Sequence, residues 1–188
     1  MKNKTLIFEP HQISFSSSFA MFGVEQVMMD WGAPLMQAHA QIVCHNQGDV
    51  LEVGFGMGIS STYIQQLNPT SHTIIEIHPE IFARAQVWAA DKPNVTLIFS
   101  DWYDCIDTLA TYDGIFLDTY GDIHHYEFAQ HVPQLAKPGA RFTWWNNLPA
   151  QQNVFDLTDV TYIEYEVNPP QNTYFNHNTY YLPVKIFG

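Results

Sequence analysis

Three glycines within five residues constrain this chain more than any other feature. Gly54, Gly56 and Gly58 follow directly on the apolar run at 50–53. Glycine accepts backbone conformations that other residues avoid, so a glycine-rich turn behind a buried strand brings the main chain close to a ligand. The turn also leaves N–H groups free at the start of the next helix. The pattern predicts a nucleotide-like ligand, although dinucleotide-binding dehydrogenases and purely structural turns share this spacing.

Strand-like and helix-like stretches alternate on both sides of this turn. The strand-like runs are rich in apolar and β-branched residues and lie at 50–53, 73–76, 95–99, 114–118 and 141–145. The helix-like stretches between them lie at 60–67, 79–90, 103–109 and 123–135. Five such units in series predict an α/β fold of the Rossmann-like kind, with a doubly wound and mostly parallel sheet.

The two ends of the chain differ from this middle part. Near the carboxyl end, β-rich runs at 161–167 and 179–186 flank a turn-forming segment at 168–172, which predicts an antiparallel hairpin. We therefore expect a single domain over 1–188, with 48–146 as the ligand-binding core and 147–188 as the closing hairpin. Residues 1–47 are expected to form a helical cap over the carboxyl edge of the sheet, with helix-like stretches at 24–29 and 34–43.

Charge and composition exclude several classes of partner. The chain has 7 Lys and Arg against 19 Asp and Glu, a net charge of -12, so nucleic acid and anionic membrane surfaces would meet no basic patch. A cationic or neutral small substrate fits this balance. The two cysteines form no zinc-binding pattern, and no signal peptide or membrane-spanning run occurs, which makes the cytoplasm the expected location. Composition does not choose between a monomer and a homodimer.

Acidic residues near the strand ends indicate which nucleotide-like ligand the glycine turn binds. Glu52 stands just inside the first strand end, and Glu76 ends the second, where a carboxylate can accept both hydroxyls of a ribose. Asp101 and Trp102 follow the third strand, beside the expected adenine. There Asp101 would accept from the exocyclic amine, although an ordinary strand-ending turn is the alternative. These residues favour S-adenosylmethionine (SAM) over NAD.

The fourth strand ends in Asp118-Thr119-Tyr120, beside the point where ligands bind in open α/β sheets. An acid there faces both a sulfonium and the group that attacks its methyl. Asp118 is thus the candidate catalytic residue, although helix capping is the alternative role for a strand-end Asp. The remaining expected cofactor contacts lie beside the strand ends and are Phe55, Ser60 and Ile77.

Several ordered motifs resemble the guanidinoacetate N-methyltransferase family and its relative, the fungal δ-arginine N-methyltransferase, both class I SAM-dependent enzymes. The resemblance runs from about Val24 to Leu148 and returns at the Tyr-rich end. In the glycine turn, Phe55 between the glycines and Met57 after them are more specific than the glycine spacing alone. The other matching segments follow in the family's order: 26–36, 74–76, 113–115, 118–120, 137–139 and 142–146.

The resemblance implies roles for individual residues. Met36 joins the SAM site, and Asp118, Tyr120 and Trp31 contact the methyl acceptor. The backbone N–H groups of Asn147 and Leu148 bind an acceptor carboxylate. In the family, two carboxylates hold the guanidino group.

This chain keeps one of those carboxylates as Asp118 but has Gly32 where the other, a Glu, stands. One carboxylate still suits a less basic amine, an amino acid or a hydroxyl substrate, because it can orient the nucleophile and accept its proton.

Two other groups of residues have alternative explanations. His124, His125 and His131 are expected on one helix as surface or pocket-lining residues, without the acidic partners of a metal site. Trp144 and Trp145, with the aromatic residues at 174–181, suggest either a cage for a cation or a packed core.

Three hypotheses follow from the sequence. The first is an N-methyltransferase for a small guanidino, amidino or amino compound. The second is an O- or N-methyltransferase of natural-product metabolism. The third is an inactive SAM-binding partner protein.

Overall fold

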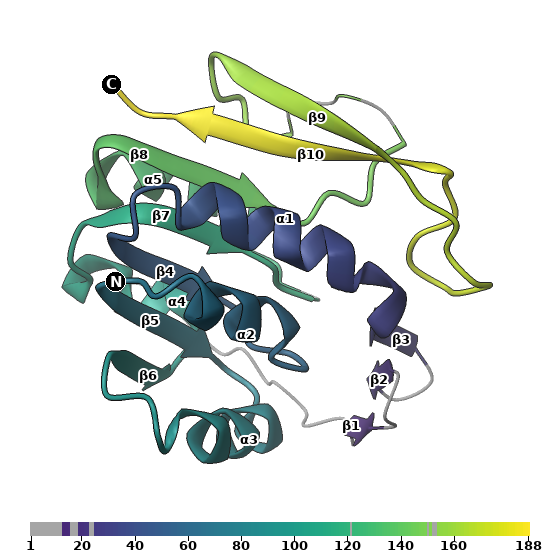
Figure 1. The fold of residues 1–188 in the computed structure, drawn as a ribbon, viewed down its shortest axis with the longest axis horizontal. Helices are drawn as coiled ribbons and strands as arrows, with labels where there is room; N and C mark the ends of the chain where they lie inside the picture. The colour runs from purple at the N-terminus through teal and green to yellow at the C-terminus, as the bar shows by residue number, and fades with distance from the viewer. Residues whose placement is uncertain (1–12, 16–18, 23–24, 121, 150, 152–153) are drawn as a thin grey trace.

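The computed structural model describes residues 13–15, 19–22, 25–120, 122–149, 151 and 154–188, with side chains from Trp31 onward. Its main feature is a seven-stranded sheet in the order β6-β5-β4-β7-β8-β10-β9. The five parallel strands are β4 (Asp49–Val53), β5 (Ser71–Glu76), β6 (Val95–Phe99), β7 (Tyr112–Leu117) and β8 (Ala136–Trp144). The predicted doubly wound α/β fold is confirmed (Figure 1).

The closing hairpin is also confirmed. Strands β9 (Val160–Glu166) and β10 (Thr179–Ile186) pair antiparallel, and β10 pairs antiparallel with β8. In Figure 1 the β10 arrow accordingly points opposite to that of β8.

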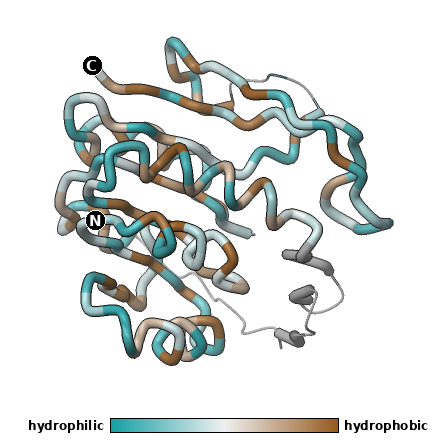
Figure 2. Tube along the Cα trace, in the orientation of Figure 1, coloured by the Kyte–Doolittle hydropathy of each residue, from teal (hydrophilic) through white to brown (hydrophobic). Residues whose placement is uncertain are grey.

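Helices cover both faces of the sheet (Figure 1). One face carries α1 (Ala33–Val43), α2 (Ile59–Gln66) and α3 (Pro79–Ala89), which pack on side chains such as Val50, Phe116 and Ile74. The other carries α4 (Trp102–Cys105) and α5 (Phe128–Leu135), which pack on Leu51, Leu117 and Phe142. Short 3-10 turns complete the fold: η1 (Asp30–Gly32), η2 (Ile106–Thr108) and η3 (His125–Glu127). Figure 2 shows the hydrophobic colouring along the central strands, as burial on both faces requires.

The amino-terminal cap differs from the sequence prediction. Residues 25–29, expected to be helical, form strand β3 (Glu25–Met29), which pairs with β2 (Phe19–Phe22); β2 in turn pairs with β1 (Ile13–Phe15). Cross-strand pairing has outweighed the local helix pattern, a common outcome for short apolar runs. Helix α1 forms as predicted but lies on a sheet face against β7 and β8.

The bounds of two further elements also differ from those predicted from the sequence. Strand β8 begins at Ala136 instead of Arg141, because Ala136 pairs with Tyr112 of β7. The register then shifts before Arg141, and Gly139 takes a positive φ of 80° in this stretch. The helix expected over 123–135 is divided into η3 and α5. His125 and His131 therefore lie on separate elements, and His124 precedes both, stacked 4.1 Å from the ring of Tyr103.

An ion-pair group ties the amino ends of the central strands together, and it yields a stability prediction. The Lys137 ammonium lies 2.5 Å from Asp49 and 2.7 Å from Asp113, and it lowers the pKa of both carboxyls. A carboxyl whose pKa falls on folding stabilises the fold above its ordinary pKa. That contribution is lost as the pH drops through the lowered value.

We expect Lys137→Met to lower the free energy of unfolding by about 1 kcal/mol at pH 7, since these groups are partly exposed. The difference from the wild type should vanish near pH 2, where the carboxyls are protonated. Denaturant titrations at both pH values measure it. Lys185→Met is the control, because the acid partner of Lys185 lies 3.9 Å away and is 90% exposed. An equal loss in the control, or a loss that persists at pH 2, would contradict the prediction.

Candidate functional site

The carboxyl ends of four parallel strands align to form one row. In the ladders Val53 pairs with Ile75 and with Leu117, and Leu117 pairs with Trp144. The next residue of each strand therefore stands in the row, in the order Glu76, Gly54, Asp118 and Trp145. Backbone bonds hold this register beyond the strands, since Gly54, Asp118 and Trp145 each donate their N–H to the neighbouring strand at 2.9 to 3.0 Å.

The glycine turn requires glycine for steric reasons. Gly54, Gly56 and Gly58 all have positive φ values, of 95°, 54° and 72°. A Cβ on Gly54 would lie 2.1 Å from the carbonyl oxygen of Asp118, and one on Gly58 would lie 2.6 Å from the ring of Phe55. The main chain of β4 thus passes directly against that of β7 at the site. The Phe55 side chain is buried against Ile74 and Ala85, so only its backbone can face a ligand.

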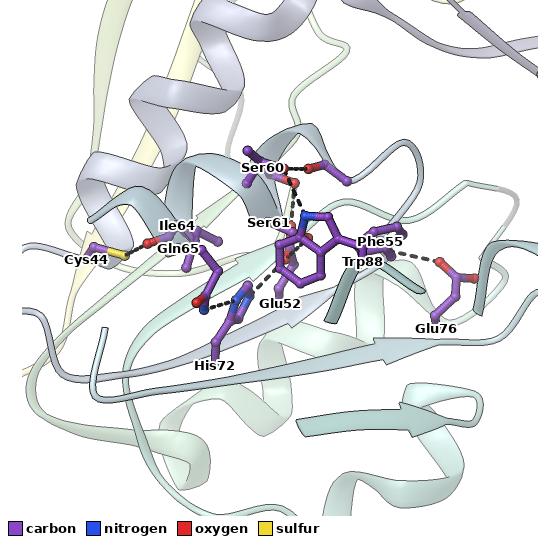
Figure 3. Close-up of polar contacts among 12 residues, drawn as sticks. Cys44, Glu52, Phe55, Ser60, Ser61, Ile64, Gln65, His72, Glu76 and Trp88 are labelled. Carbon is purple, nitrogen blue, oxygen red and sulfur yellow. Dashed lines mark hydrogen bonds and ion pairs between the residues drawn. The ribbon is translucent and has the colours of Figure 1, made fainter. Parts of the chain in front are cut away.

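Glu76 braces this turn from the next strand. One carboxylate oxygen accepts the N–H of Phe55 at 2.9 Å (Figure 3), and the other accepts that of His78 at 2.8 Å. Gly56 donates as well. Burial raises the pKa of Glu76, and these backbone bonds oppose the rise. A carboxylate offers about four acceptor positions, so three are used internally and little capacity remains for a ribose.

Glu52 is buried, and its bonds are internal. It accepts from the hydroxyls of Ser60 and Ser61, the latter at 2.5 Å, and from Nε2 of His72 at 2.9 Å (Figure 3). The Gln65 amide donates to the other ring nitrogen of His72, which leaves Nε2 as the donor to Glu52. Two residues expected to contact the cofactor, Glu52 and Ser60, therefore bond to each other, and they fix the first turn of α2 behind the glycine turn.

Asp118 has a different environment. Its side chain is partly buried, and no hydrogen bond to its carboxylate is found among the described residues. Burial raises its pKa from 3.8 to about 7, with a further contribution from the negative charge of Glu52. Phe116, two residues earlier on the same strand face, packs in the cluster beneath α1. Asp118 therefore points to the α1 side of the sheet, ready to bind a cation or accept a proton.

The residues after β6 serve the fold. Asp101 accepts the N–H of Tyr103 at 2.9 Å and caps α4. The Trp102 ring is buried against Phe128 and donates Nε1 to Asp122 at 2.7 Å, so its faces are not open to stack on a base. Asp122 also accepts from Thr119 at 3.1 Å. No local sequence signal pointed to Asp122, whose importance comes from a partner 20 positions away.

Other predicted residues lie around this row. Met36 is buried between α1 and α2, in the cluster that contacts the start of α2. Ile77 is 39% exposed after β5 and offers apolar surface beside Glu76, and Tyr120 is 46% exposed after Asp118. Among the described residues, no group of three His, Cys, Asp or Glu side chains is arranged to hold a metal ion.

The segment after β8 carries the remaining predicted residues. Leu148 donates its N–H to the side chain of Asn146 at 3.0 Å, so that donor is already used. The Asn147 side chain accepts from Nε1 of Trp145. Trp31 lies in η1, and its ring stands 6.3 Å from that of Trp145. Two of the predicted acceptor residues, Trp31 and Asn147, therefore adjoin Trp145.

The electrostatics of the site favour a cation. Residues 31–83, 93–136 and 142–184 contain no Lys or Arg, and every strand-end loop on the carboxyl side falls within these ranges. The carboxylates of Asp118 and Glu52 therefore meet no nearby positive side chain from these segments. Within the described residues, no helix is long and apolar enough to cross a membrane.

Comparisons with known proteins show which proteins this chain resembles. A family model described as guanidinoacetate N-methyltransferase matches residues 15–177. The chain is 33% identical to protein arginine N-methyltransferase 2 of Yarrowia lipolytica over 161 residues, covering 76% of this chain and 34% of that protein. It is 30% identical to the Saccharomyces cerevisiae protein of the same name, covering 86% and 48%. This chain thus spans about a third to a half of the length of these relatives.

Similar solved structures show the fold. Spermidine synthase from Thermotoga maritima matches with a TM-score of 0.70 and 12% identity, covering 94% of this chain and 72% of that one. The O-methyltransferase TomG from Streptomyces achromogenes, solved with SAM, matches with a TM-score of 0.59 and 18% identity, covering 82% and 80%.

Proposed function

This chain belongs to the guanidinoacetate N-methyltransferase family, and we propose that it transfers a methyl group from SAM to a nitrogen of a guanidino compound. The observation that supports this most is Asp118, a partly buried carboxylate at the strand-end row next to the glycine turn, for which the described residues supply no hydrogen-bond donor.

The residues present fit SAM. The backbone of 54–58, the one remaining acceptor position of Glu76 and the apolar surface of Ile77 would hold it. Met36 of α1 would lie nearby, and Asp101 would contribute the carboxylate oxygen that does not cap α4. When bound, SAM supplies a methyl group activated by a positively charged sulfur, a charge that the acidic site favours. Glu76 fixes the backbone of this turn, and Glu52 fixes the first turn of the helix that follows it.

The chain's own contribution is to orient the acceptor and remove its proton. A free guanidinium has a pKa above about 12 and cannot attack while protonated. The Asp118 carboxylate would bind two of its N–H groups and take one proton as the nitrogen attacks. A bound cation also favours the ionised form of Asp118. The rest of the rate enhancement would come from alignment.

Two kinds of acceptor are compatible with this site. The family's description points to a small guanidino compound, whereas the relatives are named for protein arginine. Both present the same guanidino group to Asp118. The inactive-partner alternative is supported by Gly32, which leaves Asp118 as the single carboxylate of the expected pair.

The deciding experiment has two arms. Isothermal titration calorimetry measures SAM binding, and transfer of a labelled methyl group is screened with guanidinoacetate, arginine, agmatine, an arginine-containing peptide and matched amines. Transfer to any guanidino acceptor supports the proposal, and the preferred acceptor identifies its size class. SAM binding without transfer to any acceptor would instead support an inactive binding protein.

The pH dependence of the reaction provides a further prediction. Because the pKa of Asp118 is raised to about 7, its base form is depleted below that value. We expect kcat/KM to fall about tenfold per pH unit below pH 7 and to level off above it. Initial rates between pH 5.5 and 9 measure this. A flat profile with unchanged SAM affinity would contradict the role of Asp118 as the base.

A further inference from the structure

We propose that Trp145 is the residue on which the methyl acceptor stacks, and that Trp145 and Asp118 together select a planar delocalised cation over an alkyl ammonium ion. The inference rests on the proposed function and specifies the chemical class of its acceptor. It assigns the binding role to an aromatic ring beside a single carboxylate.

The first argument is the register of the sheet. Leu117 and Trp144 are paired in the parallel ladder, and Trp145 donates its N–H to the Leu117 carbonyl at 3.0 Å. Asp118 and Trp145 are therefore lateral neighbours on strands about 4.8 Å apart. Thr143, two residues before Trp145, bonds to His39 of α1, so Trp145 points to the same face as Asp118.

The second argument is that the Trp145 ring is held in place yet remains partly exposed. Its Nε1 donates to Asn147, and its ring lies 4.9 Å from that of Tyr180. The rings of Trp31, Tyr174 and Phe175 stand 6.3, 6.2 and 6.1 Å away. An indole fixed in this way loses little entropy when a ligand stacks on it.

A buried hydrogen-bond chain underlies the ring. Thr143 donates its hydroxyl to the Pro183 carbonyl, so it must accept from Nδ1 of His39 at 2.8 Å. His39, whose pKa burial lowers to about 3, is neutral, and its Nε2 accepts from Tyr180 at 2.8 Å. Tyr180 in turn accepts the N–H of Asn146 at 3.0 Å. Each donor and acceptor in this chain is matched, and the chain fixes the backbone directly after Trp145.

The third argument is the space beside the ring. Gly32 directly precedes α1, and among the described residues a Cβ placed on it would meet one heavy atom within 4 Å, Cη2 of Trp145 at 4.0 Å. No side chain from this position covers the edge of the indole. The nearby segments also bring no Lys or Arg that would compete for the ring.

These features select for acceptor shape. A guanidinium or amidinium is planar, so it can stack on an indole while its edge donates hydrogen bonds to a carboxylate. An alkyl ammonium ion can pair with Asp118 but is strongly hydrated and offers no flat surface. The pair Asp118 and Trp145 should therefore discriminate by planarity, whereas the carboxylate alone would discriminate only by charge.

The test measures binding without turnover. Protein saturated with S-adenosylhomocysteine is titrated with arginine and with ornithine, which carries an ammonium in place of the guanidinium. The variants are Trp145→Met, which removes the aromatic ring, and Trp145→Phe, which keeps a smaller one. Tyr181→Phe is the matched control. It changes an aromatic residue on β10, directly after Tyr180, and removes only its hydroxyl. Thermal denaturation confirms that each variant is folded.

We expect Trp145→Met to weaken arginine binding about tenfold, Trp145→Phe to weaken it about threefold, and the control to bind like the wild type. Ornithine should bind more weakly to the wild type and be little affected by either variant. Affinity for S-adenosylhomocysteine should stay within about twofold throughout. If Trp145→Met does not fold, arginine and ornithine binding are compared between the wild type and Trp145→Phe alone.

Unchanged arginine binding in the Trp145 variants would overturn the inference, as would an equal loss for ornithine or for S-adenosylhomocysteine. Failure of the proposed function is recognised separately. It would appear as wild-type protein that binds arginine through Trp145 but transfers no methyl group to any guanidino acceptor.

Discussion

Replacing Asp118 by Asn is expected to lower kcat about a thousand-fold or more while SAM still binds. The amide keeps the shape of the side chain but cannot accept the proton of the attacking nitrogen, and positioned bases contribute about 10² to 10⁴ in rate. Loss of the charge that orients a cationic acceptor adds to this effect. Single-turnover methyl transfer and calorimetric titration with SAM measure the two quantities separately.

The control for this variant is Asp113→Asn, which makes the same change of charge on the same strand. Asp113 lies at the opposite end of β7, bound to Lys137 and Asn46. We expect it to cost stability but to leave kcat near the wild-type value. Full activity in Asp118→Asn, or an equal loss of activity in the control, would refute the assigned role of Asp118.

Asp118→Asn should also raise stability at neutral pH. A carboxyl whose pKa is raised on folding binds more protons in the folded than in the unfolded state between about pH 4 and 7, so its contribution falls as the pH rises through that window. Removing the group should flatten this decline. Thermal unfolding at pH 5 and pH 8 would show the variant gaining on the wild type at the higher pH.

Gly54→Ala is expected to have the second large effect, lowering the affinity for SAM about a hundred-fold or more and the free energy of unfolding by about 3 kcal/mol or more. The backbone at Gly54 has a φ of 95°, and the added methyl would lie 2.1 Å from the Asp118 carbonyl oxygen. Relief requires β4 and β7 to separate, which displaces the glycine turn and Asp118 together. Denaturant unfolding and calorimetry with SAM measure these effects.

Gly139→Ala is the control that distinguishes backbone strain from the steric collision expected in Gly54→Ala. Gly139 also has a positive φ, of 80°, but nothing lies within 4 Å of a Cβ added there. It should cost about 1 to 2 kcal/mol from strain alone and leave SAM affinity unchanged. If both glycine variants were equally stable and bound SAM equally well, neither the stability nor SAM binding would depend on the close approach of β4 to β7.

Much of the fold could be predicted from local patterns in the sequence. The alternation of apolar runs with helix-like stretches predicted the five parallel strands and the closing hairpin, because burial on both sheet faces leaves a periodic trace in the sequence. The segment at 25–29 was misassigned because its strand character depends on pairing with β2, a contact that a short apolar run does not encode.

The functional site also contains residues that the local sequence identifies and residues whose roles depend on distant partners. Glycine spacing and strand-end position are local, so the sequence predicts the turn at Gly54 and the strand-end Asp118, and the structure adds their direct contact. The roles of Glu52 and Trp102 depend on partners 20 positions away in each case, His72 and Asp122, and these bonds turn expected ligand contacts into structural ones.

By itself, then, the sequence determined the α/β fold, the glycine turn and the acid that ends β7, because strand periodicity and the steric freedom of glycine are properties of consecutive residues. Only the tertiary structure decided which polar groups are already satisfied and which remain available. It also brought Trp145 beside Asp118, since hydrogen-bond partners and burial are set by residues remote along the chain, as His39 and Tyr180 show at a separation of 141 positions.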